Sequence, residues 1–67
     1  MAINVSKDVY DGLEKVRESG LTNIFDRIRV IQILSSWGED EAAEWVNNNR
    51  DTYGKGIFEG FEVNGSQ

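Results

Sequence analysis

The fold is decided by residues 24–37, whose sequence is IFDRIRVIQILSSW. At 100° per residue, one apolar face of a helix over this range consists of Ile24, Ile28, Ile31 and Leu34. A second apolar face consists of Val30, Ile33 and Trp37. Helices that are apolar on most of their surface are usually buried on several sides. We therefore predict that residues 24–37 form the central helix of the fold, capped at its start by Thr22 or Asn23.

The preceding segment predicts a helix over about residues 7–19. Ser6 is a favourable N-cap, and Gly20 suits the left-handed position that follows many helices. A narrow apolar stripe at helical spacing consists of Val5, Val9, Leu13 and Val16. This stripe is the face that we expect to pack against the central helix.

The C-terminal part predicts two further helices, over about residues 40–49 and 51–59. Glu39, Asp40 and Glu41 favour a helix start, because negative charge stabilises the positive end of the helix dipole. For residues 57–63 both helix and strand stay open, because their apolar positions fit a period of four and a period of two. The tripeptide 54–56, Gly-Lys-Gly, indicates either a flexible helix interior or a point of close approach.

These elements predict an all-α fold, a small domain of three to four short helices packed around the central helix. We expect residues 1–63 to form a single helical domain and residues 64–67 a frayed tail. A chain of 67 residues has room for one domain with a limited core. It has no Cys and hence no disulfide, so additional stabilisation would come from oligomerisation or from a partner.

The charge distribution argues against a nucleic-acid partner. The net charge is −5, and residues 39–67 carry Arg50 and Lys55 against seven acidic side chains. Nucleic-acid binding needs a basic footprint. In an alternative hypothesis, the chain binds DNA through a helix-turn-helix, and the helix over residues 24–37 presents Arg27 and Arg29 to the DNA. Asp26 weakens it, because this carboxylate lies at the helix end that would meet phosphate.

The composition also excludes the common catalytic arrangements. The chain has neither His nor Cys, so nucleophilic catalysis of the Ser-His or Cys-His kind is impossible. The densest carboxylate group, Glu39, Asp40, Glu41 and Glu44, has no calcium-loop pattern and is expected to be a solvated helix start. We therefore expect no enzymatic activity, no cofactor and no metal site.

The aromatic side chains are numerous for a chain of this size, with two Trp, two Tyr and three Phe. Most should lie in the core, but a small helical domain cannot easily bury all of them. An exposed apolar patch usually marks an interface. Some apolar residues lie outside the main apolar faces of the predicted helices and are least needed for the core. We predict that these residues bind a partner, namely Val30, Ile33, Trp37, Phe58 and Phe61. Self-association as a homodimer through Val30, Ile33 and Trp37 is the other alternative.

The turn before the central helix carries a specific pattern, Ser-Gly-x-Thr-Asn-hydrophobic-Phe-Asp at residues 19–26, followed by Trp45-Val46, Tyr53 and Ile57-Phe58. Over residues 9–60 the chain resembles a family of short proteins of phages and prophage-like elements of Gram-positive bacteria, known only as a domain of unknown function. Ile24 departs from the family's Met, and the acidic stretch 39–44 has no match in the family's pattern. Physically, the motif is typical of a structural corner between two helices.

The resemblance implies no catalytic residue and no cofactor. It implies a mobile-element setting, in which small acidic helical proteins often bind and redirect a host protein. The first residues lack a secretory signal pattern, and no apolar stretch is long enough to span a membrane. We expect a cytoplasmic protein, in the host cytoplasm if phage-encoded, that modulates or inhibits a host or phage protein.

Overall fold

The structure is a computed structural model and describes residues 2–63. The element order is β1 (Ile3–Val5), α1 (Lys7–Ser19), α2 (Arg27–Ser36), α3 (Asp40–Asn48), α4 (Arg50–Glu59) and β2 (Phe61–Val63). The prediction of a small helical fold is confirmed, with one short parallel sheet added to the four helices of this part of the chain. The predicted frayed tail, residues 64–67, lies outside the described residues.

Helix α1 has the predicted bounds because both of its caps form as expected. The Ser6 hydroxyl accepts a hydrogen bond from the Val9 amide at 3.3 Å, and Gly20 adopts a left-handed conformation with φ of 69°. Val9, Leu13 and Val16 are buried on the side that faces the other helices. The local signals and the tertiary packing therefore agree over this helix.

Helix α2 begins three residues later than predicted. The Asn23 side chain accepts a hydrogen bond from the Phe25 amide at 2.9 Å, and this turn keeps residues 23–25 out of the helix. The Asp26 carboxylate then accepts from the Arg29 amide at 3.2 Å and caps the helix. Asp26 is the cap in place of Thr22 or Asn23, because its side chain satisfies the free amides of the first turn.

The core lies between α1, α2 and α3. Helix α2 contributes Val30, Ile33 and Leu34 to it, whereas Ile28 is 55% exposed. Helices α1 and α3 approach closely at Gly12, where an added Cβ would lie 2.7 Å from the Cβ of Ala42. Helix α2 is thus covered by its neighbours on one side only. The covered face is the one that carries Val30 and Ile33.

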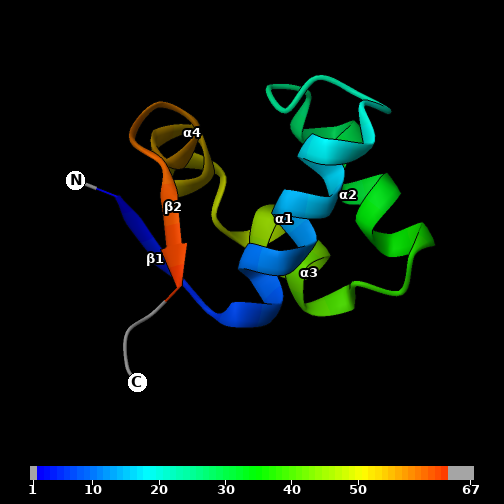
Figure 1. Cartoon of the computed structure of the whole chain (residues 1–67), viewed down its shortest axis with the longest axis horizontal. Helices are drawn as coiled ribbons and strands as arrows, with labels where there is room; N and C mark the ends of the chain where they lie inside the picture. The colour runs from blue at the N-terminus through cyan, green and yellow to red at the C-terminus, as the bar shows by residue number, and fades with distance from the viewer. Residues whose placement is uncertain (1, 64–67) are drawn as a thin grey trace.

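Strands β1 and β2 bring the two ends of the described chain together in a parallel pair. Ile3 pairs with Phe61 and Val5 pairs with Val63, and the Ile3 amide donates to the Gly60 carbonyl at 2.9 Å. Residues 57–63 are therefore helical up to Glu59 and extended from Phe61, with Gly60 at a φ of 95° between them. Figure 1 shows the sheet at one end of the molecule, beside α4.

In the part of the chain that the structure describes, no helix is long and apolar enough to cross a lipid bilayer.

Candidate partner-binding surface

Three of the five predicted partner-binding residues lie inside the molecule or partly so. Val30 is fully buried and Ile33 is 9% exposed, because α1 and α3 cover this face of α2. Phe61 is half-buried, with its ring centroid 6.0 Å from that of Trp45 and 5.9 Å from that of Tyr53. Val30 and Ile33 are therefore core residues and form no surface, and Phe61 joins the sheet to the core.

Trp37 is the C-cap residue of α2, and its side chain is 40% exposed. It borders an open hollow of about 410 Å³ together with Lys15, Glu18 and Ser19 of α1. The nearby Lys15 ammonium pairs with the Glu39 carboxylate at 2.6 Å. In Figure 1, α4 and the end of α2 lie on opposite sides of the view. The structure therefore does not bring Trp37 together with Phe58.

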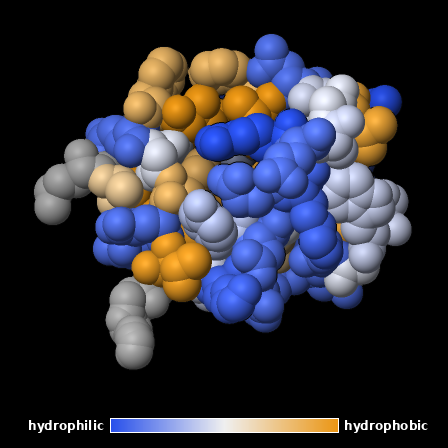
Figure 2. Space-filling view, viewed as in Figure 1, coloured by the Kyte–Doolittle hydropathy of each residue, from blue (hydrophilic) through white to orange (hydrophobic). Residues whose placement is uncertain are grey.

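Phe58 is the most exposed large apolar side chain described, at 82%, and it lies against Phe25, which is 60% exposed. The two ring centroids are 5.8 Å apart, with an angle of 59° between the rings. Figure 2 shows hydrophobic residues along the upper edge of the molecule, over α4 and the segment that leads into α2. Two aromatic rings that contact each other in solvent form an apolar patch of the kind found at interfaces.

The two rings border a hollow of about 280 Å³. Its lining, which we call the Phe25–Phe58 surface, consists of Phe25, Arg27, Arg50, Tyr53, Gly54, Ile57 and Phe58. Helix α4 contributes residues 50, 53, 54, 57 and 58 of this lining. Residues 50, 54, 57 and 58 are spaced at three and four and therefore share one side of the helix. The buried residues of α4 are Tyr53, at the inner edge of this lining, and Gly56, which lies outside it.

Tyr53 fixes the two sides of this surface relative to each other. Its hydroxyl donates a hydrogen bond to the Ile24 carbonyl at 2.6 Å, which connects α4 to the segment that presents Phe25. Burial raises the pKa of Tyr53 to about 12, against a smaller lowering by the nearby Arg27 guanidinium. The hydroxyl therefore stays protonated over the physiological range and keeps donating this bond.

Positive charge borders the hollow on two sides. Within residues 2–63, Arg27 and Arg50 form no ion pair, and the guanidinium of Arg27 makes only a long 3.5 Å contact to the Val46 carbonyl. No acidic side chain of the described chain lines the hollow. The Phe25–Phe58 surface thus combines apolar rings with two available cations, in a chain of net charge −5.

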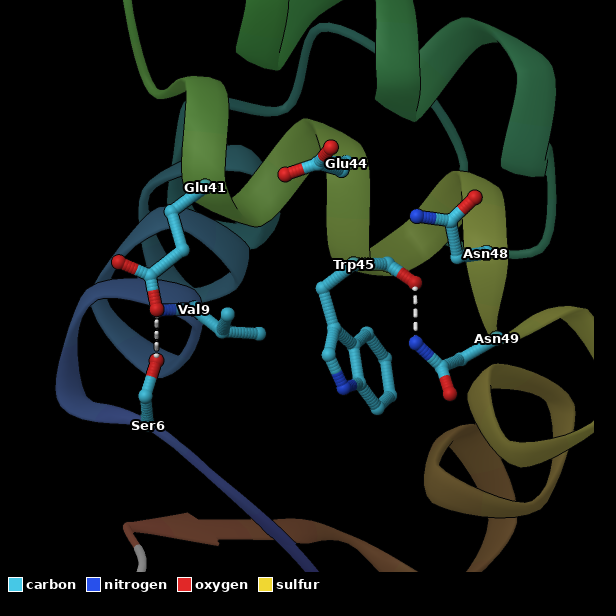
Figure 3. A pocket seen from close by; sticks show the side chains of 7 residues that line it. All are labelled: Ser6, Val9, Glu41, Glu44, Trp45, Asn48 and Asn49. Carbon is cyan, nitrogen blue, oxygen red and sulfur yellow. Dashed lines mark hydrogen bonds between the residues drawn. The ribbon is translucent and has the colours of Figure 1, made fainter.

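A third hollow lies between the start of α1 and α3. Figure 3 shows Glu41 of α3 beside Ser6, whose hydroxyl donates to the Glu41 carboxylate at 2.8 Å, with Glu44 and Trp45 further along the helix. The Asn49 amide donates to the Trp45 carbonyl at 2.9 Å. The side chains of Ser6, Glu41 and Asn49 are thus engaged in hydrogen bonds within the chain. No group of three or more acidic side chains in the described residues is arranged to hold a metal ion.

Sequence reasoning named Phe58 as a partner-binding residue and did not name its neighbour Phe25. Phe25 fell inside the helix predicted over residues 24–37, because that helix was predicted to begin at Ile24. The signal that could have placed Phe25 is the pair Asn23 and Asp26, since both residue types favour turns and caps over helix interiors.

The comparison with protein families confirms the expected resemblance to a domain of unknown function. The family described as a domain of unknown function, DUF5049, matches residues 5–61, and the chain belongs to this family. No curated protein and no solved structure matches the chain.

Proposed function

We propose that this chain is a small, non-enzymatic binding module that docks onto a protein partner through the Phe25–Phe58 surface. The observation that carries the proposal is the exposed pair itself, with Phe58 at 82% and Phe25 at 60% exposure. Aromatic side chains and arginines dominate the energetics of protein interfaces, and both line this hollow.

The rest of the proposal concerns the setting. The resemblance to short proteins of phages and prophage-like elements supports a phage-encoded protein that acts in the host cytoplasm. There it would modulate or inhibit a host or phage protein by occupying one of its surfaces. The absence of His and Cys from the sequence favours such a binding role over catalysis.

Two alternatives have less support. DNA binding by α2 would place Arg29 near phosphate, but the Asp26 carboxylate caps the same helix end. The alternative of self-association uses Val30, Ile33 and Trp37, of which only Trp37 is exposed. The Phe25–Phe58 surface therefore offers the stronger starting point for an experiment.

The proposal is tested by photo-crosslinking in a Gram-positive host. A benzophenone amino acid replaces Phe58 in one variant and Val63, which is 43% exposed on β2, in a matched control. We expect one host or phage protein to crosslink from position 58 and not from position 63. An equal pattern from both positions, or no crosslink from position 58, would contradict the proposal. A band at twice the chain mass would assign the surface to self-association.

A further inference from the structure

We infer that the hollow of the Phe25–Phe58 surface is a preformed pocket for one apolar side chain of the partner that is flanked by an aspartate or glutamate. The inference rests on the proposed function and specifies the chemistry of the partner segment. It follows from the floor of the hollow and from the charges at its rim.

Gly54 lines the hollow, and we call the part of the hollow beside it the floor. This floor is open because residue 54 has no side chain. Gly54 lies inside helix α4, and it is not among the glycines with positive φ. A Cβ added there would meet no atom within 4 Å. Alanine would therefore fit the fold at this position, and it would favour the helix by about 1 kcal/mol. Neither the backbone nor the packing of the described chain calls for a glycine here.

The other two glycines inside helices have clear packing reasons. At Gly12 an added Cβ would press on Ala42 of α3, and at Gly56 it would overlap the ring of Phe61. Both glycines allow parts of the same chain to approach closely. Gly54 provides the same kind of close approach, but towards solvent, beside Phe58 and Ile57. A partner side chain is the group that this open floor can accommodate.

The rim selects the charge of that partner. Arg27 lies on the α2 side of the hollow and Arg50 at the start of α4, and neither forms an ion pair within residues 2–63. A guanidinium binds carboxylates well because its donors match the carboxylate geometry. The preferred occupant is therefore an apolar side chain with a carboxylate next to it in the partner sequence.

Three small probes that carry a phenyl ring on a four-carbon chain with a different polar end test this inference: 4-phenylbutyrate, 4-phenylbutanol and 4-phenylbutylamine. Each is titrated into the ¹⁵N-labelled chain, and the amide signals of Gly54 and Phe58 are followed by NMR. We expect the carboxylate to bind about tenfold more tightly than the alcohol, and the amine to bind most weakly.

Three variants give the controls. A Cβ at position 54 meets no atom within 4 Å, and we expect a leucine there to occupy the hollow, so Gly54→Leu should abolish the response to all three probes. Arg50→Glu should remove the preference for the carboxylate, and adding Arg27→Glu should invert it. Lys55→Glu makes the same charge change on the exposed part of α4 outside the hollow, and it should leave the preference unchanged.

Equal binding of the carboxylate and the alcohol would overturn the inference on charge, and so would an equal effect of Lys55→Glu and Arg50→Glu. If the Gly54→Leu variant bound the probes as well as the original chain does, the hollow would not be their binding pocket. If no probe binds while position 58 still crosslinks to a partner, the inference fails and the proposed function stands. If both experiments are negative, both fail.

Discussion

Helix α1 buries every large apolar side chain of its stripe, whereas helix α4 leaves its largest one in solvent. Val9, Leu13 and Val16 of α1 are at most 4% exposed. In α4, Tyr53 is buried, whereas Phe58, five residues later in the same helix, is 82% exposed. One helix thus has a single apolar face, and the other has two.

The difference shows what each face contributes. The stripe of α1 has neighbours in α2 and α3, so its burial stabilises the fold. On α4, Phe58 packs against Phe25 but is still 82% exposed, so its apolar area adds little to folding and remains available to another molecule. Substitutions on the two helices should therefore separate stability from binding.

The largest effect is expected in the stripe of α1. Leu13→Ala removes buried methyl groups and should lower the free energy of unfolding by about 2 to 5 kcal/mol. In a domain of this size that loss leaves much of the protein unfolded. Urea denaturation followed by far-ultraviolet circular dichroism measures it. A loss below about 1 kcal/mol would mean that the stripe of α1 is not a core face.

The next effect compares two glycines on α4. Gly56→Ala forces the Phe61 ring to move and should destabilise the protein by about 1 to 3 kcal/mol. Gly54→Ala meets open space and should stabilise it by up to about 1 kcal/mol. The same urea experiment measures both variants. Changes of the same sign would contradict the assignment of opposite faces to these two residues.

The third effect concerns the hydrogen bond that connects α4 to residue 24. Tyr53→Phe leaves the Ile24 carbonyl without its donor and should cost about 1 to 2 kcal/mol at neutral pH. The folded-state pKa of Tyr53 is raised from 10.0 to about 12, so the folded protein holds this proton more tightly than the unfolded chain. The contribution is present below pH 10 and is lost as the pH rises towards 12.

The matched measurement is the unfolding free energy of both proteins between pH 9 and 12. Other groups, including Lys7 and Lys15 with their raised pKa values, are common to both proteins, so the difference isolates Tyr53. We expect the two curves to converge as the pH rises. A constant difference would show that the Tyr53 hydroxyl does not titrate differently in the folded state.

The smallest effect on stability, and the largest on binding, is expected for Phe58→Ser. The side chain is mostly in solvent, so its loss should change the free energy of unfolding by less than about 1 kcal/mol. The variant should nonetheless lose the crosslinked partner when the benzophenone amino acid is placed at Phe25. Retained crosslinking with unchanged stability would remove Phe58 from the binding surface.

Local signals predicted the parts of the fold that depend on neighbours in sequence. The bounds of α1 follow from Ser6 and Gly20, and both caps were predicted. The start of α2 was predicted too early, because the apolar Ile24 and Phe25 fit the helix period while Asn23 turns the chain before Asp26. Here a side-chain hydrogen bond to the backbone outweighed the apolar pattern.

Features that depend on distant residues could not be predicted in the same way. Val30 and Ile33 were expected on the surface, and only the position of α1 and α3 shows that their face is the covered one. A period of two left a strand open within residues 57–63, but its partner β1 has only three residues, too few for a periodic signal, so the pairing could not be predicted. The Phe25–Phe58 contact likewise joins two segments that are remote in sequence.

The parallel pairing of β1 with β2 has a consequence for how the chain reaches its final shape. The hydrogen bond from the Ile3 amide to the Gly60 carbonyl spans almost the whole described chain, so it closes a loop that contains all four helices. Closing such a loop is entropically unfavourable, and contacts between remote residues form slowly. The sheet is therefore expected to assemble after the helices have packed. Hydrogen exchange at the single amide of Ile3 would then report the closure of the entire molecule, because that amide is protected only when the first and last elements have met.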